Sequence, residues 1–107
     1  MGAQMTSRLD PYTYILIDRK PVQHANDDEW FHWYLDYANR RVAKTTIGDI
    51  EISTVFTSLN IIPQDMALFE TMVFGGEHNY ECWRCHTWEE AVKQHNKIVA
   101  MIEGEQS

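Results

Sequence analysis

Two long runs of strand-forming residues lie within residues 48–76, and they limit the folds that this chain can adopt. In residues 50–59, β-branched and aromatic side chains fall on both faces of an alternating pattern. Residues 66–74 do the same, and the polar segment 60–65 between them predicts a loop. Since strands with apolar residues on both faces are covered on both sides, we expect this pair at the centre of a sheet.

Three shorter strands should accompany the central pair. Residues 12–17 and 22–24 are expected to form a hairpin, and residues 42–47 should lead into the first central strand. Gly48 and Asp49 form a two-residue connection with glycine first, which is typical of a type II′ hairpin.

Two helices complete the predicted fold. The first covers residues 28–39 and has an apolar arc of about 200°, wider than one sheet face requires. The second begins at Thr87, where Glu90 completes a capping box, and ends near Glu103. The order ββα-βββ-α predicts an α+β fold, a small antiparallel sheet of about five strands with two helices, as one domain over residues 1–107.

Charge and hydropathy restrict the partners. Nine basic and sixteen acidic residues give a formal net charge of −7, which disfavours direct binding to nucleic acid or to an anionic membrane. No apolar run approaches the ~20 residues of a membrane helix. Residues 1–11 are expected to be a loose polar lead-in without the apolar core of a signal peptide. We therefore expect a cytoplasmic protein whose two cysteines remain thiols.

A CxxCH motif, formed by Cys82, Cys85 and His86, lies in the segment 77–86, which we expect to be a polar loop. Its spacing is that of c-type haem attachment, but that chemistry requires export. With His78 it offers four possible zinc ligands, although a second half-site is missing. A redox CxxC needs a helix that begins after its first cysteine, and here the helix begins after both. We expect no cofactor and keep these four residues only as metal candidates.

Glu70 and His95 are the candidate catalytic residues. Glu70 interrupts an apolar strand, where a carboxylate needs a partner or an open cleft. His95 lies near the centre of the apolar stripe of the last helix. Together they could support acid–base chemistry in a small enzyme or a nucleotide-binding protein. The alternative, which we favour, is a buried network that fixes the helix on the sheet. Other possible partners of Glu70 are Arg40, Arg41, Ser53 and Thr54.

The first helix carries the candidate binding residues. Trp33 and Tyr37 lie at one edge of its apolar arc, beside Glu29 and Asp36, and Trp30 lies on the same arc. Aromatic residues with a charged rim are typical of protein interfaces. We expect Trp33 and Tyr37 to be partly exposed and to contact a partner, either a second copy or a target protein.

The orientation of this helix has two possible solutions. In the first, Phe31, Tyr34 and Ala38 lie near the middle of the arc and face the sheet. In the second, the segment 77–86 folds over the aromatic edge and places Trp83 there, so that the candidate binding residues belong to the core.

Four separate blocks of the chain, in order, resemble a family of small uncharacterised proteins encoded by bacteriophages and prophages. The blocks are residues 40–45 (RRVAKT), 52–56 (ISTVF), 68–76 (LFETMVFGG) and 87–91 (TWEEA) with His95. The resemblance covers roughly residues 28–100, and the CxxCH segment departs from it.

The resemblance implies a context and brings no known activity. It implies a phage accessory protein that acts by binding a host or phage protein. Small acidic phage proteins often inhibit a host system. The sharpest function that the resemblance implies is therefore inhibition of a bacterial defence system such as CRISPR. The alternatives are the small enzyme or nucleotide-binding protein with a Glu70/His95 cleft, and a zinc-stabilised interaction module.

Overall fold

The structure, a computed structural model, describes residues 13–24, 27–58 and 66–106. The predicted lead-in at residues 1–11 and the predicted loop at 60–65 lie outside the described residues.

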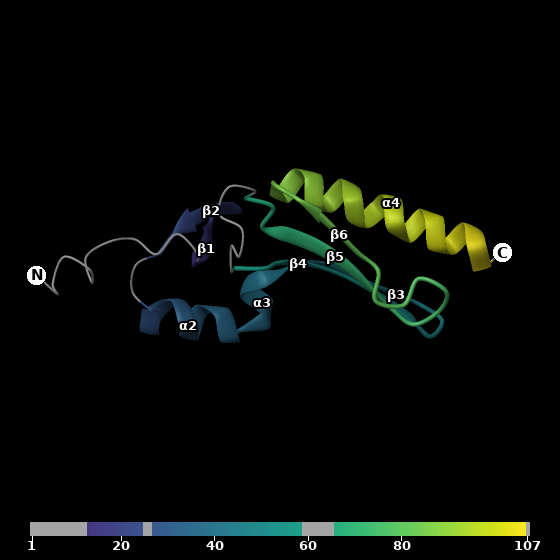
Figure 1. The fold of residues 1–107 in the computed structure, drawn as a ribbon, viewed down its shortest axis with the longest axis horizontal. Coiled ribbons are helices and arrows are strands. Elements are labelled where there is room, and N and C mark those ends of the chain that lie inside the picture. Colours follow the sequence, from purple (N-terminus) through teal and green to yellow (C-terminus); the bar gives the residue numbers. More distant parts are fainter. Residues whose placement is uncertain (1–12, 25–26, 59–65, 107) are drawn as a thin grey trace, which may run out of the picture.

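A four-stranded antiparallel sheet is the centre of the fold (Figure 1). The order along the sheet is β3-β4-β5-β6, so the two long predicted strands, β4 and β5, occupy its middle as expected. Gly48 has a positive φ of 58°, whereas Asp49 does not, and this difference matches the predicted type II′ turn between β3 and β4. The bounds are Arg41–Ile47 for β3, Ile50–Phe56 for β4, Phe69–Phe74 for β5 and Cys82–Cys85 for β6.

The two N-terminal strands form a sheet of their own. β1 (Tyr14–Ile17) pairs with β2 (Lys20–Gln23) around Asp18 and Arg19, which both adopt positive φ as in a type I′ turn. The predicted single sheet of about five strands is therefore wrong in detail. The described residues form sheets of two and four strands, and the fourth strand of the larger sheet is β6, which lies inside the predicted polar loop at residues 77–86.

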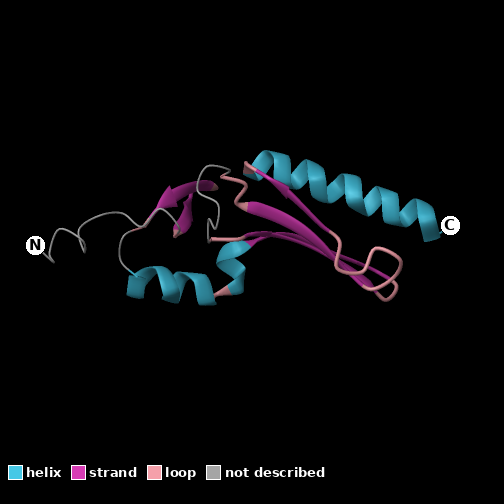
Figure 2. Ribbon diagram, viewed as in Figure 1, coloured by secondary structure: helices cyan, strands magenta, loops and turns pink. Residues whose placement is uncertain are grey.

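Three helices are described where two were predicted (Figure 2). The expected helix at residues 28–39 is divided at Asp36 into α2 (Asp27–Leu35) and α3 (Tyr37–Arg40). The Asp36 carboxylate accepts a hydrogen bond of 3.1 Å from the N–H of Ala38, so it caps a new helix instead of continuing the old one.

The last helix, α4 (Trp88–Gln106), begins as predicted and extends past the expected end. The N–H of Glu90 donates to the Thr87 hydroxyl at 3.0 Å, as a capping box requires. The Glu90 carboxylate reaches one residue further back than expected and accepts from the N–H of His86. Gly104 does not end the helix, because it keeps helical backbone geometry.

α4 covers one face of the four-stranded sheet and contacts all four strands. The face beneath it holds two apolar clusters. One surrounds Phe56 and Phe69 near β1 and Trp88, and the other joins Ile52 and Val73 to the C-terminal half of α4. Side chains on alternate positions of each strand point to the opposite face, where α4 provides no cover.

Candidate functional site

His95 lies between α4 and the sheet and is 3% exposed, which confirms the predicted burial. Its Nε2 lies 2.8 Å from the Thr45 hydroxyl on β3, and its Nδ1 lies 2.8 Å from the Thr54 hydroxyl on β4. The Thr54 hydroxyl lies 2.6 Å from that of Thr71 on β5. The ring therefore joins one helix to three strands through a buried polar chain.

A backbone carbonyl sets the direction of this hydrogen-bond chain. The amide nitrogen of Gln94 donates to the carbonyl of Trp83 at 3.0 Å and to the Thr71 hydroxyl at 3.1 Å. Thr71 can then donate to Thr54, and Thr54 to Nδ1 of His95, because each hydroxyl has one proton to give. The remaining proton of the ring lies on Nε2 and points to Thr45, so every member is satisfied when His95 is neutral.

A second proton on His95 would reverse this order. Nδ1 would become a donor, Thr54 would have to turn its proton to Thr71, and Thr71 would lose its acceptor. Burial lowers the pKa of His95 below its ordinary value of 6.5, in agreement with the neutral ring. The network is therefore typical of a structural clamp that fixes α4 on the sheet.

Glu70 does not meet His95. It neighbours Thr71 on β5 and therefore points to the opposite face of the sheet. Its carboxylate pairs across the strands with Arg84 on β6 at 3.2 Å, and it also lies 3.6 Å from the Cys82 sulfur. The two side chains that a Glu70/His95 cleft requires lie on different sides of the sheet, and the candidate partners Arg40, Arg41, Ser53 and Thr54 are replaced by Arg84.

The two cysteines cannot act together at one site. Both belong to β6 and are three residues apart, so Cys82 points to the face of Glu70 and Cys85 points into the core beneath α4. Burial is the main cause that raises the pKa of Cys85 to about 11, and the negative charge of Glu90 adds to it. Burial also raises the pKa of Cys82, and there the charge of Glu70 adds to it. Both are therefore protonated at neutral pH, unlike the thiolates of metal or redox sites. The Nδ1 atom of His86 lies 3.8 Å from the Glu90 carboxylate.

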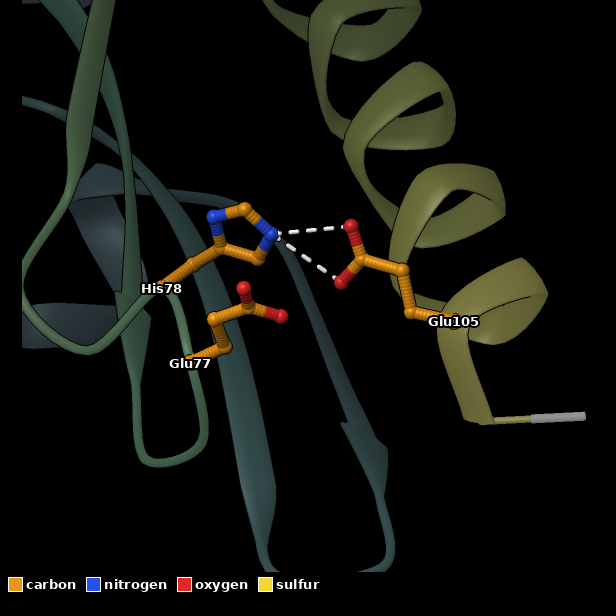
Figure 3. Close-up of side chains that lie close together, drawn as sticks. All are labelled: Glu77, His78 and Glu105. Atoms are coloured by element: carbon orange, nitrogen blue, oxygen red, sulfur yellow. Dashed lines mark hydrogen bonds and ion pairs between the residues drawn. The ribbon is translucent and has the colours of Figure 1, made fainter.

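His78, the fourth metal candidate, belongs to a different cluster (Figure 3). Its Nε2 lies 2.9 Å from the Glu105 carboxylate near the end of α4, and its Nδ1 lies 2.9 Å from Glu81. Potential ligand atoms of Glu77, His78 and Glu105 all lie within 4.8 Å of one another. The Glu105 carboxylate, followed by that of Glu81, raises the pKa of His78 to about 9, so the ring holds its proton at neutral pH, and a metal would have to displace it.

This ion-paired cluster predicts a pH dependence of stability on the alkaline side. A folded pKa of about 9, above the ordinary 6.5, means that the stabilisation is complete below pH 6.5 and is lost as the pH rises through 9. We expect the difference in melting temperature between wild type and His78→Asn to shrink over this range. Thermal melts from pH 6 to 10 at low and high salt measure it. A difference that does not change with pH would contradict the assignment, and salt should reduce it because the cluster is on the surface.

The predicted binding residues on the first helix fall into two groups. Trp30 and Trp33 pack inward. The Trp30 indole N–H donates a hydrogen bond of 2.8 Å to the Ser58 hydroxyl, and Trp33 packs edge-on against Phe56 with 5.8 Å between the ring centroids. The expectation that Phe31 and Ala38 face the sheet is therefore wrong, since Phe31 is 51% exposed and Ala38 is also exposed, whereas Tyr34 is half-buried and Trp33 and Tyr37 are partly exposed as expected. The competing interpretation, with Trp83 over this helix, is wrong as well, because Trp83 packs against the cluster beneath α4.

Tyr37 is the residue of this set that reaches an exposed surface of the sheet. Its side chain is 40% exposed, and its hydroxyl lies 3.1 Å from that of Ser53, on the face opposite α4. Glu29 lies 3.2 Å from His24, and Asp36 caps α3. These two acidic residues therefore have local partners.

Tyr37 is at one end of an apolar strip on the face that α4 leaves open. Met72 pairs across the strands with Ser53, whose hydroxyl Tyr37 contacts, and Phe74 follows two residues later on the same face. Tyr80 packs edge-on against Phe74, with 6.1 Å between the ring centroids. Two cross-strand ion pairs flank the strip, Lys44–Glu51 at 3.5 Å and Arg84–Glu70 at 3.2 Å. We call this set the open-face strip; its residues are Tyr37, Met72, Phe74 and Tyr80.

The sequence predicted only Tyr37 of the open-face strip. Alternation places Met72 and Phe74 on one face of their strand, but it does not determine which face α4 covers. Tyr80 lies in the segment that was predicted to be a loop.

Comparison with known proteins adds no relative. No protein-family model, no curated protein and no solved structure matches this chain. Within residues 13–24, 27–58 and 66–106, no helix is both long enough and apolar enough to cross a membrane.

Proposed function

We propose that this chain acts by binding another protein through the open-face strip. The observation that carries this proposal is the contrast between the two faces of one sheet. Beneath α4 the face is packed, whereas Phe74 and Tyr37, on the other face, are 37% and 40% exposed. Aromatic residues and methionine, flanked by charged pairs, have the composition of an interface centre and its rim.

The charge of the chain favours a partner with a basic surface. The net charge is −7, while the ion pairs beside the open-face strip leave the strip itself close to neutral. Apolar contacts at the strip would then provide affinity, and the acidic remainder of the chain would steer a basic partner toward it.

The identity of the partner is proposed from the family resemblance. As a phage accessory product, the chain would bind a host or phage protein, and the sharpest version is an inhibitor of a bacterial defence system such as CRISPR. A second copy of the chain is the other possible occupant of the strip.

Affinity capture with paired variants tests this function. Phe74 on the open-face strip and Val92 on α4 are each 37% exposed, so Phe74→Glu and Val92→Glu place the same charge at equally exposed sites on opposite sides of the molecule. We expect wild type and Val92→Glu to capture one bacterial or phage protein in stoichiometric amounts. Phe74→Glu should capture about tenfold less of it. Melting curves must show that both variants remain folded.

The complex is then rebuilt from purified components. The open-face strip is not the binding site if Phe74→Glu binds the partner as well as wild type does. The same conclusion follows if Phe74→Glu and Val92→Glu both lose the partner. If the chain captures no other protein but forms a dimer that Phe74→Glu dissociates, the occupant of the open-face strip is a second copy of the chain. Restored phage growth on a CRISPR-protected strain, in wild type but not in Phe74→Glu, would support the anti-defence version.

A further inference from the structure

A groove of about 400 Å³ lies between β6 and the side of α4, away from the open-face strip. Trp83 forms its sheet side, and Ile98 and Met101 contribute further apolar surface from α4. Lys97 lies at the same groove, one helical turn before Met101. Gln94 also lines the groove, and its amide nitrogen donates hydrogen bonds to the Trp83 carbonyl and the Thr71 hydroxyl. The groove is thus mostly apolar, has one cation and is built on regular elements.

The strand beside this groove has an open edge. In the described part of the chain, β6 has β5 as its one neighbour in the sheet. The N–H of Val73 donates to the carbonyl of Glu81 at 3.1 Å, which marks this pair as hydrogen-bonded. Since antiparallel pairs alternate, the pair Thr71–Trp83 is hydrogen-bonded too. The N–H and C=O groups of Cys82 and Arg84 therefore point away from β5, toward the open edge.

Lys97 adds positive charge beside this edge on the α4 side, while the carboxylates of Glu90 and Glu70 lie near Cys85 and Cys82 at the two ends of β6. Lys97 makes no ion pair with the described residues, and Lys93 precedes it by one turn on α4. Arg84, on the edge strand itself, is 51% exposed at its side chain and shares its charge with Glu70. An acidic group beside the edge would therefore find, at Lys97, a cation that has no ion-pair partner among the described residues.

We propose that the edge of β6 binds an extended peptide segment of a partner protein, which adds as a further strand and places an apolar side chain in the groove and an acidic side chain at Lys97. Backbone hydrogen bonds to Cys82 and Arg84 supply sequence-independent affinity, and the groove supplies specificity. Alternation along the added strand places every second side chain on the α4 side. This site shares Arg84 with the border of the open-face strip, but its groove lies on the α4 side of the sheet and the proposal does not rest on the function proposed for the strip.

Charge argues against a second copy of this chain as the occupant. If two β6 strands paired edge to edge, the Lys97 side chains of both copies would come near the same interface, whereas Arg84 is already paired with Glu70. Like charges at an interface disfavour that pairing. An acidic and apolar segment meets no such repulsion.

A panel of synthetic peptides provides the test. The probes are capped hexapeptides of alternating threonine and valine with one central apolar residue (leucine, methionine, phenylalanine or tryptophan) and an aspartate two residues later, so that both side chains lie on the α4 side of the added strand. In NMR titrations we expect at least one probe to shift the backbone amides of β6 and the indole N–H of Trp83. The same peptide with lysine in place of aspartate should bind about tenfold more weakly. Lys97→Glu, a surface change, should reverse this preference.

N-methylated probes test the strand geometry separately. Methylation removes one backbone donor, so alternate positions of the bound peptide should respond differently: methyl groups on the amides that face β6 abolish binding, and those on the other amides are tolerated. The proposal is overturned if all N-methylated probes bind alike, if no probe shifts β6 at millimolar concentration, or if Lys97→Glu leaves the charge preference unchanged. Shifts of β6 that depend on protein concentration without peptide would also overturn it, in favour of a second copy.

Discussion

His95→Ala is expected to lower the free energy of unfolding by about 2–4 kcal/mol, because it leaves a cavity and removes a partner from the buried Thr54 hydroxyl and the half-buried Thr45 hydroxyl. The ring bridges Thr45 and Thr54 at 2.8 Å each, beneath a helix that depends on this contact for its position on the sheet. Urea denaturation monitored by circular dichroism measures the change. Asn96→Ala, the exposed neighbour on α4, is the matched control and should stay within about 0.5 kcal/mol of wild type.

A double substitution separates the lost hydrogen bonds from the lost volume. His95→Leu fills most of the space but leaves Thr45 without its ring partner, and adding Thr45→Val removes that unsatisfied hydroxyl. We expect the second change to recover part of the stability in the His95→Leu background and to destabilise wild type. If the two effects simply add, the bond between Thr45 and His95 contributes nothing.

The acidic side of the stability profile reports on the same ring. The pKa of His95 is depressed in the folded protein, so the unfolded chain takes up a proton first as the pH falls below 6.5. The stabilisation that depends on the neutral ring is complete above pH 6.5 and decreases below it, and His95→Leu should lack this part of the slope. A His95 variant with an unchanged melting temperature but no partner binding would make His95 a site residue instead of a structural one.

Trp33→Ala is expected to destabilise the fold by about 2–3 kcal/mol, less than a fully buried tryptophan because the side chain is only half-buried. Trp33 lies edge-on against Phe56 at 5.8 Å and packs on the cluster that joins Phe56 and Phe69 to β1. Its loss would loosen the attachment of α2 to the larger sheet. The melting temperature should fall by several degrees while partner capture at low temperature persists.

Phe31→Ala is the matched control on the same helix. Phe31 is 51% exposed, so its removal should change stability by no more than about 0.5 kcal/mol. The opposite result, in which Trp33→Ala keeps the wild-type melting curve but abolishes capture, would return Trp33 to the binding site that its sequence position first indicated.

The sequence alone determined the elements whose local pattern is unambiguous. Alternating apolar residues identified β4 and β5 and placed them in the middle of a sheet, because both faces of each strand were apolar. Thr87 and Glu90 marked the start of α4, since a capping box depends only on residues close in the chain. The burial of His95 followed from its position in a narrow apolar stripe.

Tertiary structure decided the elements that depend on distant partners. The segment of Cys82 and Cys85 alternates as a strand does, but its four residues form a strand only because β5 is beside them. Pairing with β5 places the two cysteines on opposite faces and gives Glu70 its partner Arg84. Asp36 was equally compatible with a helix interior or a cap, and only the fold selected the cap.

The candidate site belongs to this second class. Strand alternation divides Glu70 and Met72 from Thr71 and Val73 in any register, but it does not state which group a helix will cover. Packing of α4 answered that question: it buried His95 against Thr45 and Thr54 and left Phe74 and Tyr37 on the open face. A binding surface on a sheet is the part of the pattern that the rest of the chain does not cover, and this depends on contacts between residues far apart in the sequence.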